Sequence, residues 1–175
     1  DVYKRQVNSK INKLHQELKK DKIDNIFVSA PENIAWLLNI RGSDNPNSPI
    51  PNCRLLINSK GNYYVICAKK KLIELIRERK IKKNQIIEPE MIEFLISKIN
   101  GGKIIVDDKS CSIFYEKLFK RKFKIIKKKD PIYFFKSIKN KYEIKNMIQS
   151  HILDGVALTK FLHWIKIINK RKITE

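Results

Sequence analysis

The sequence has few cysteines and no long apolar run, and each absence excludes a class of protein. Its three cysteines, Cys53, Cys67 and Cys111, are far apart, and no pair has the spacing of a zinc site or a CxxC motif. We therefore expect reduced thiols and a cytoplasmic location. No apolar run approaches the roughly 20 residues that a membrane-spanning helix needs, so no membrane partner is expected. Neither a glycine-rich phosphate loop nor a Gly-x-Ser-x-Gly elbow is present, which removes support for nucleotide binding and for that class of hydrolase.

Acidic residues are scarce relative to basic ones. The chain has 18 Asp and Glu against 38 Lys and Arg, which gives a formal net charge of +20. Such a charge normally indicates a nucleic acid or an anionic membrane as partner. The basic residues are, however, 31 Lys and only 7 Arg, and the chain also has 30 Ile. Phosphate and base recognition favours Arg, so a compositional bias toward Lys and Ile is the preferred interpretation, and no specific nucleic acid is expected.

Apolar periodicity predicts an α/β fold. Helical spacing is found in residues 8–20, 32–39, 69–80, 89–99 and 110–120, and strand-like runs in residues 25–29, 54–58, 62–67, 85–88, 103–107 and 123–126. Ser29 is the expected N-cap of the second helix, with Pro31 in its first turn. The turn formers of residues 59–61 predict a hairpin between two of the strands. Strands that alternate with helices, together with one hairpin, predict a mixed sheet flanked by helices.

A domain boundary is expected at Asp130-Pro131. We expect residues 7–131 to form a first, non-catalytic domain, and residues 132–175 to form an apolar connector and a long helix of a truncated second one. The helix is predicted from about residue 140 to 169, and Gly155 is expected to bend it or to admit a close neighbour. Its apolar residues recur at i,i+4 spacing at Ile144, Ile148, Ile152 and Val156. Because this stripe has little to pack on within the chain, we expect the sequence to be a fragment.

Local pairs of polar residues give no complete catalytic group. His151 and Asp154 share one helix face at i,i+3, but a metal site requires at least three converging ligands, so a structural role is preferred. Asp107 and Asp108 follow a predicted strand, and adjacent strand residues point to opposite faces and cannot easily converge. We expect them to cap the following helix, where a carboxylate complements the helix dipole. No catalytic or metal-binding residue is therefore assigned.

The loop from Arg41 to Pro51 is the segment most suggestive of a function. It holds three prolines, one glycine and several polar turn formers, which exclude a helix or a central strand. Arg41 and Asp44 follow a helix that should hold them rigidly. Two interpretations are open: an Arg41–Asp44 pair that orders the loop, which is favoured, and a wall that binds a carboxylate or an amine beside a neighbouring site.

Two separated motifs resemble those of the Xaa-Pro aminopeptidases. Residues 32–44 read ENIAWLLNIRGSD, which is similar to the run IAWLxNxRGxD in the creatinase-like middle domain of that family. Residues 136–158 resemble the run KAxKNxxEIxxMRxAHIxDGxAL, which opens the catalytic domain, and the closing ITE of residues 173–175 also matches. Ile148 stands where the family usually has Arg, which puts any salt bridge at that position in doubt.

The resemblance implies a creatinase-type N-terminal fold followed by the first helix of a truncated pita-bread domain. It implies a metalloaminopeptidase whose substrate is a peptide with proline at the second position, and Arg41 and Asp44 would lie near that substrate. Two divalent ions, usually manganese, would be held by residues beyond Glu175, so this fragment is expected to bind no metal and to be inactive. For the whole protein, a homodimer is an open alternative to a monomer. The alternative function is a non-catalytic creatinase-like module that binds protein partners.

Overall fold

The computed structural model describes residues 6–168, and they fall into two compact units. The first unit runs to Ser137 and the second begins at Ile138. The connector expected from Ile132 is a helix of the first unit, α6 (Ile132–Ser137), and its Ile132 and Phe135 are buried in the core. The first compact unit therefore ends at Ser137, and the domain boundary expected at Pro131 stays a prediction. The ITE sequence of residues 173–175 lies outside the described residues.

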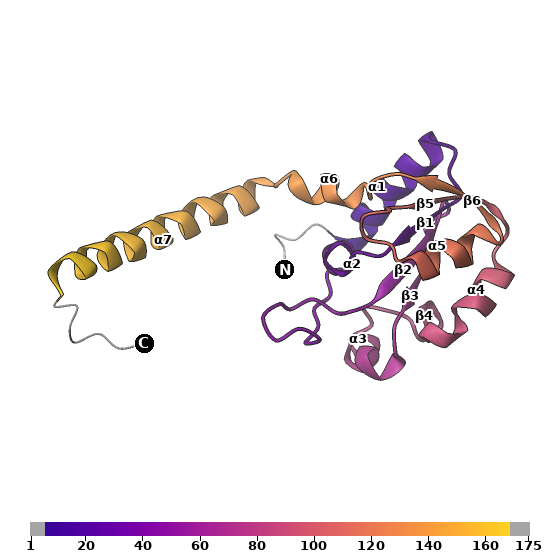
Figure 1. Ribbon diagram of the computed structural model, residues 1–175, viewed down its shortest axis with the longest axis horizontal. Helices are drawn as coiled ribbons and strands as arrows, with labels where there is room; N and C mark the ends of the chain where they lie inside the picture. Colours follow the sequence, from indigo (N-terminus) through magenta and orange to yellow (C-terminus); the bar gives the residue numbers. More distant parts are fainter. Residues whose placement is uncertain (1–5, 169–175) are drawn as a thin grey trace. The chain divides into compact units, whose positions relative to one another are not determined.

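The first unit is built on a mixed six-stranded sheet, as the sequence predicts (Figure 1). The strand order is β4-β3-β2-β1-β5-β6. The strands are β1 (Asn25–Val28), β2 (Arg54–Asn58), β3 (Tyr63–Ile66), β4 (Ile86–Ile87), β5 (Gly102–Val106) and β6 (Phe123–Lys127). β2 pairs antiparallel with both β1 and β3, and the β2–β3 pair is the predicted hairpin. β1, β5 and β6 run parallel to one another, and β4 is parallel to β3.

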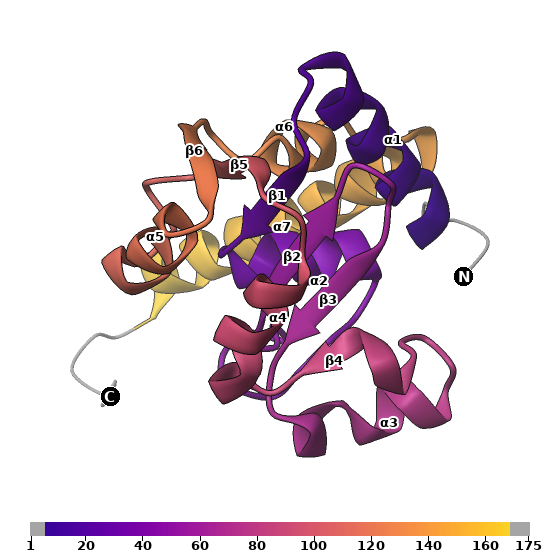
Figure 2. The same cartoon turned by 90° about the vertical axis from the view of Figure 1, so that its right-hand side faces the viewer.

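Helices cover both faces of this sheet, and Figure 2 shows α2 and α4 on opposite sides of it. One face carries α1 (Val7–Lys20), α2 (Pro31–Leu38) and α6, and the other carries α4 (Ile92–Lys98) and α5 (Ile113–Lys120). The strands alternate between the two cores because successive strand side chains point to opposite faces. In β2, for example, Leu55 and Ile57 enter the first core and Leu56 enters the second.

Several predicted elements are shorter than the apolar spacing indicates. The helix expected at residues 69–80 is a 3-10 turn, η1 (Lys69–Leu72), followed by α3 (Ile73–Arg77), and it ends before Arg79, whose φ of 55° is left-handed. The strand expected at 85–88 is reduced to β4, because η2 (Lys83–Gln85) occupies its start. The helix expected at 89–99 begins as η3 (Pro89–Met91) before α4.

Two predicted helix caps are wrong. α2 follows Ala30, and the Ser29 hydroxyl makes no capping bond, whereas Pro31 does lie in the first turn. α5 follows Ser112, and the Asp107 carboxylate instead accepts the backbone N–H of Lys109 at 3.0 Å and of Asp130 at 2.9 Å. The physical reason is burial: Asp107 is 4% exposed, and the buried Asp130 N–H needs its carboxylate as acceptor. Asp108, in contrast to the buried Asp107, is exposed.

The second unit, in its described part, is the long helix α7 (Lys141–Ile167). Asn140 caps it by accepting the N–H of Tyr142 and of Glu143, and Glu143 accepts the Asn140 N–H in return at 2.6 Å. Its large apolar side chains are about half exposed and include Leu153, Phe161 and Trp164 as well as the predicted stripe. At 100° per residue these positions surround the helix, so the apolar surface is not one stripe.

Candidate functional site

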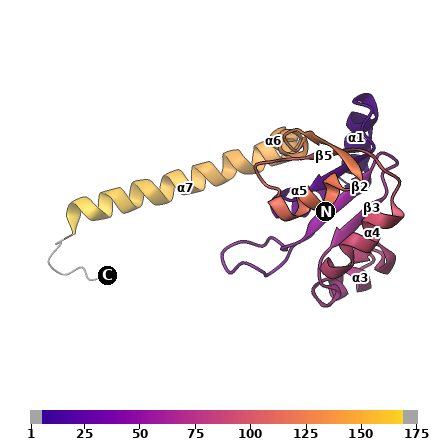
Figure 3. The ribbon, with the colours of Figure 1, turned by 45° about the vertical axis from the view of Figure 1, so that its right-hand side comes forward.

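The loop between α2 and β2 is held tightly at both ends, and Figure 3 shows it projecting from the sheet where β2 begins. At its start Asn39 adopts a left-handed φ of 53°, and the Ile40 N–H donates to the Ala35 carbonyl at 3.1 Å. The two arms of the loop meet where the Gly42 N–H donates to the Pro49 carbonyl at 3.2 Å. A Cβ at Gly42 would lie 2.6 Å from Pro51 Cα, so only glycine allows the arms to approach this closely.

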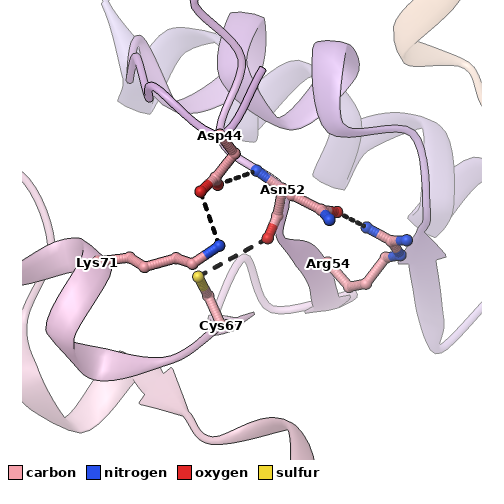
Figure 4. A network of polar contacts seen from close by, with 5 residues as sticks. All are labelled: Asp44, Asn52, Arg54, Cys67 and Lys71. Carbon is pink, nitrogen blue, oxygen red and sulfur yellow. Dashed lines mark hydrogen bonds and ion pairs between the residues drawn. The ribbon is translucent and has the colours of Figure 1, made fainter. Parts of the chain in front are cut away.

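Asp44 is the residue that ties the loop to the rest of the first unit (Figure 4). Its Oδ1 forms an ion pair with Lys71 Nζ at 2.7 Å, and its Oδ2 accepts the Asn52 backbone N–H at 2.7 Å. The Asn52 side chain in turn accepts from Arg54 Nη1 at 2.9 Å. The hydrogen bond from Lys71 is the largest cause that lowers the pKa of Asp44, and the Asn52 N–H adds to it. Asp44 is therefore a carboxylate at neutral pH.

Arg41 and Asp44 are not brought together, so the predicted pair between them is wrong. The Arg41 side chain is exposed and donates to the Ile40 carbonyl at 2.9 Å, whereas Asp44 bonds to Lys71 and Asn52. An internal ion pair does order the loop, but its cation lies 27 residues away in sequence. The predicted hairpin is the sequence feature that indicates this ion pair. Pairing β2 with β3 places the end of the loop, just before β2, beside the lysine-rich segment just after β3.

Asp44 also lines a hollow of about 400 Å³ between the loop and the start of α2. The lining residues are Pro31, Glu32, Asp44, Asn45, Pro46, Ser48, Ile50 and Asn52. Two carboxylates at the wall and apolar surface from two prolines and an isoleucine suit a small cationic group with an apolar neighbour. The hollow has no nucleophile paired with a base, so its chemistry is that of binding and not of bond cleavage.

A buried polar network behind the hollow fixes α2 against α6. Asn33 Nδ2 donates to Asp130 Oδ2 at 2.7 Å, and Lys136 Nζ donates to Asn33 Oδ1 at 2.7 Å. The remaining Asp130 oxygen accepts the Ile132 N–H at 2.9 Å. Burial raises the pKa of the Asp130 carboxyl, although the Asn33 hydrogen bond opposes that shift. The network positions the base of α2, from which Glu32 reaches the hollow.

The described residues contain no converging ligand set for a metal ion. In residues 6–168, no group of three or more His, Cys, Asp or Glu side chains is placed to hold one. His151 and Asp154 both lie exposed on α7. Over the same residues, no helix has both the length and the hydropathy needed to cross a membrane.

Curated proteins similar to this chain are Xaa-Pro aminopeptidases. Xaa-Pro aminopeptidase 1 of Dictyostelium discoideum is 34% identical over 173 residues, which cover 93% of this chain and 26% of that protein. Xaa-Pro aminopeptidase ApepP of Drosophila melanogaster is 30% identical over 159 residues, which cover 87% of this chain and 25% of that protein. The chain therefore spans about a quarter of the length of these relatives.

Solved structures share the fold at lower identity. An X-prolyl aminopeptidase from Caenorhabditis elegans, described as a cytosolic enzyme with a di-nuclear active site, matches with a TM-score of 0.72 and 23% identity over 93% of this chain and 28% of that one. An Xaa-Pro dipeptidase from Bacillus anthracis matches with a TM-score of 0.63 and 16% identity over 94% of this chain and 44% of that one. The creatinase/prolidase N-terminal domain matches residues 2–143, and the chain belongs to that family.

Proposed function

We propose that this chain is part of a metalloaminopeptidase that hydrolyses the bond between an N-terminal residue and a following proline. The observation that carries the proposal is the 34% identity to Xaa-Pro aminopeptidase 1 of Dictyostelium discoideum along 93% of this chain. The two motifs at residues 32–44 and 136–158 also stand in the same order as in the family. The substrate is then a peptide with proline at its second position.

The chemistry is proposed to reside outside this chain. Two divalent ions, taken to be manganese, would activate the attacking water and polarise the scissile carbonyl in the whole protein. The di-nuclear site of the Caenorhabditis elegans neighbour supports a pair of ions. The described residues do not fit such a centre, because no three candidate ligands converge among them. We therefore assign no metal to this chain and expect the chain alone to be inactive.

This chain is proposed to supply a substrate-proximal wall through Asp44 and Arg41. Asp44 is ionised, is anchored by Lys71 and Asn52, and faces a hollow that Glu32 and two prolines also line. A carboxylate held in this way can accept the N–H groups of a peptide amine. Arg41 is exposed and extends from the same loop, so it can meet a carboxylate or carbonyl of the substrate.

The setting proposed for the whole protein is the cytoplasm, without a nucleic-acid or membrane partner. Three free cysteines in the described residues are compatible with a reducing compartment. The excess of Lys over Arg favours a solvated surface over a phosphate-binding one. A homodimer remains one of two candidate assemblies, and sedimentation of the whole protein distinguishes it from a monomer.

The proposal is tested by assaying the whole gene product and this chain side by side. With manganese added, the whole protein should release the N-terminal residue from a peptide with proline second, and should act poorly on the same peptide with alanine second. A chelator should abolish the activity and manganese should restore it, whereas this chain alone should give no hydrolysis. Hydrolysis by this chain would overturn the placement of the chemistry. A metal-loaded whole protein without hydrolysis would favour the non-catalytic binding module.

The role of the wall is tested in the whole protein with single substitutions. Asp44→Ala and Arg41→Ala should raise KM for the proline peptide more than they lower kcat, because they remove binding groups and not reacting ones. Glu78→Ala, on an exposed turn with its own ion pair to Lys80, is the matched control and should leave both constants unchanged. If Asp44→Ala and Arg41→Ala behave like that control, the loop is not part of the substrate site.

A further inference from the structure

Two cysteines that are distant in sequence lie opposite each other at the open end of the β2–β3 hairpin. The ladder pairs Arg54 with Ile66 and Leu55 with Val65. Continuing the same antiparallel register by one residue places Cys53 directly opposite Cys67. The spacing of 14 residues matches no known cysteine motif, and only the strand register brings the two positions together.

The two thiols also share one face of the sheet. Cys53 and Cys67 are 2% and 3% exposed, and both belong to the same core cluster as Leu55 and Val65, which are their neighbours two residues along each strand. Directly opposed residues of an antiparallel pair have Cβ atoms about 4.5–5.5 Å apart, close to the roughly 3.5–4.5 Å of a disulfide. Both cysteines are free in this structure. Cys111, by contrast, packs against the other core.

This cysteine pair borders the network that anchors the loop. Cys67 Sγ lies 3.8 Å from the Asn52 carbonyl oxygen, and the Asn52 N–H is bound by Asp44 (Figure 4). Cys53 is the residue by which the loop enters β2. A covalent bond at this position would join the end of the loop to the end of β3, beside Lys71. It would therefore fix the residues that hold Asp44 in place.

We propose that Cys53 and Cys67 form a reversible cross-strand disulfide when the protein meets a low-molecular-weight disulfide, and that this bond locks the base of the loop. In the balanced step, the Cys67 thiolate attacks the small disulfide and releases one small thiol. The Cys53 thiolate then displaces the second small thiol from Cys67. The two protein thiols are oxidised, the small disulfide is reduced, and the two thiol protons end on the released thiols. This inference does not depend on the proposed peptidase activity.

Cys67 is the better entry point for the reaction. Burial raises the pKa of both thiols, and for Cys53 the rise is large, to about 12. Positive charge opposes the rise at both sites, chiefly that of Arg54 at Cys53 and that of Lys71 at Cys67. Because the thiolate is the attacking form, the reaction should be slow at neutral pH. Its rate should increase about tenfold per pH unit as long as the pH lies below the pKa of the attacking thiol.

The test treats the reduced, folded chain with glutathione disulfide, blocks the remaining thiols and maps the tryptic peptides by mass. The peptides of residues 42–54 and 61–69 each contain one cysteine of the pair, and residues 110–117 contain Cys111. We expect the first two peptides to be joined in the folded chain, and a mixture of all three pairings when the reaction is run in urea. Hydrogen exchange at the Asn52 and Cys53 amides should then slow in the oxidised chain and return to its starting rate after reduction.

Two single substitutions separate this site from general thiol oxidation. Cys111→Ser should leave the joined peptides and the slowed exchange unchanged. Cys53→Ser should abolish both and leave Cys67 carrying a mixed disulfide with glutathione. The proposal is overturned if the folded chain gives no reaction, gives only mixed disulfides, or gives the same mixture of pairings as the urea-treated chain. It is also overturned if the disulfide forms without any change in exchange at Asn52.

Discussion

At the scale of single residues, Asp44 connects the two arms of its own loop with the segment after β3. It accepts from Lys71 after β3 and from the Asn52 N–H before β2, while itself lying in the loop after α2. Its side chain is 25% exposed and that of Lys71 is 41% exposed, so solvent screens the pair. The pair should therefore govern the order of the loop more than the stability of the whole unit.

Replacing Asp44 by Asn should loosen the loop without a resolvable change in the unfolding midpoint. Hydrogen exchange at the Asn52 amide should become faster, because a neutral amide oxygen is a weaker acceptor than a carboxylate. The pKa of Asp44 is lowered below its ordinary 3.8. The contribution of Asp44 to the order of the loop is thus complete above pH 3.8 and is lost as the pH falls through the lower pKa of the folded state. The Asn52 exchange rates of the parent and of Asp44→Asn should therefore converge in strong acid. Glu78→Gln should leave the loop unchanged, and equal Asn52 exchange in parent and Asp44→Asn would contradict the prediction.

Asp130 should show the opposite pH dependence, because burial raises the pKa of its carboxyl above 3.8. The folded state binds the carboxyl proton of Asp130 more tightly than the unfolded state does. The contribution of the protonated carboxyl to stability is therefore complete below pH 3.8 and is lost as the pH rises through the pKa of the folded state. Asp130→Asn removes the titration. Measured by urea titration, the free energy of unfolding of this variant should therefore increase relative to that of the parent from acid to neutral pH. Asp130→Ala leaves the Asn33 and Ile132 donors unpaired and should cost about 2–4 kcal/mol. If the difference in the free energy of unfolding between the parent and Asp130→Asn is constant with pH, the raised pKa of Asp130 does not contribute to stability in this way.

At the scale of elements, Lys10 of α1 closes the carboxyl end of α2. The Lys10 side chain is buried, donates to the Trp36 carbonyl and to Asn39 Oδ1, and lies 4.5 Å from the centre of the Trp36 ring. A cation at a helix C-terminus satisfies carbonyls that have no partner within the helix and complements the helix dipole. α2 in turn sets the direction in which the loop leaves, so α1 contributes indirectly to the placement of Asp44.

Lys10→Met should destabilise the first unit by about 2 kcal/mol, since hydrogen bonds from charged groups contribute about 1.5–3 kcal/mol. Chemical unfolding followed by circular dichroism measures the change. Lys19→Met, on the exposed face of α1, is the matched control and should stay within about 0.5 kcal/mol of the parent. If the two variants are equally stable, Lys10 does not serve as the cap of α2.

The sequence predicts elements well where burial repeats regularly, and less well where local turns dominate. α1 and the β2–β3 hairpin were expected almost at their observed bounds, because Ile11, Leu14 and Leu18 and the strand runs follow clear periods. The left-handed Arg79 follows the end of α3, and Pro89 begins the 3-10 turn η3, and apolar spacing detects neither boundary. The cap at Ser29 failed because Ala30 directly precedes α2, and the cap at Asp107 failed because α5 begins at Ile113, later than the expected residue 110.

The sequence singles out the loop that carries Asp44 but not the contacts of that loop, and the role of the loop as a site stays a proposal. The proline-rich loop and Asp44 were identified from composition, whereas Lys71, Asn52 and Glu32 required the strand register and the packing of α2. Local spacing does not reveal the Cys53–Cys67 pair for the same reason, because only the strand register brings the two residues together. Contacts between residues that are far apart in the sequence are thus what the single sequence does not predict here.

At the scale of the whole molecule, truncation of the chain at different residues tests the C-terminal limit of the first unit. Ile132 and Phe135 of α6 are 0% and 2% exposed in the core, and losing each buried side chain costs about 2–5 kcal/mol. Their combined loss is comparable to the total stability of an ordinary domain, about 5–15 kcal/mol. A chain that ends at Asp130 should therefore unfold at a much lower temperature or fail to fold, whereas one that ends at Lys139 should keep a cooperative transition. The full α/β signal in circular dichroism and the thermal midpoint report the difference. A chain ending at Asp130 with the same midpoint as the longer one would instead place the limit at Pro131, where the sequence first indicated it.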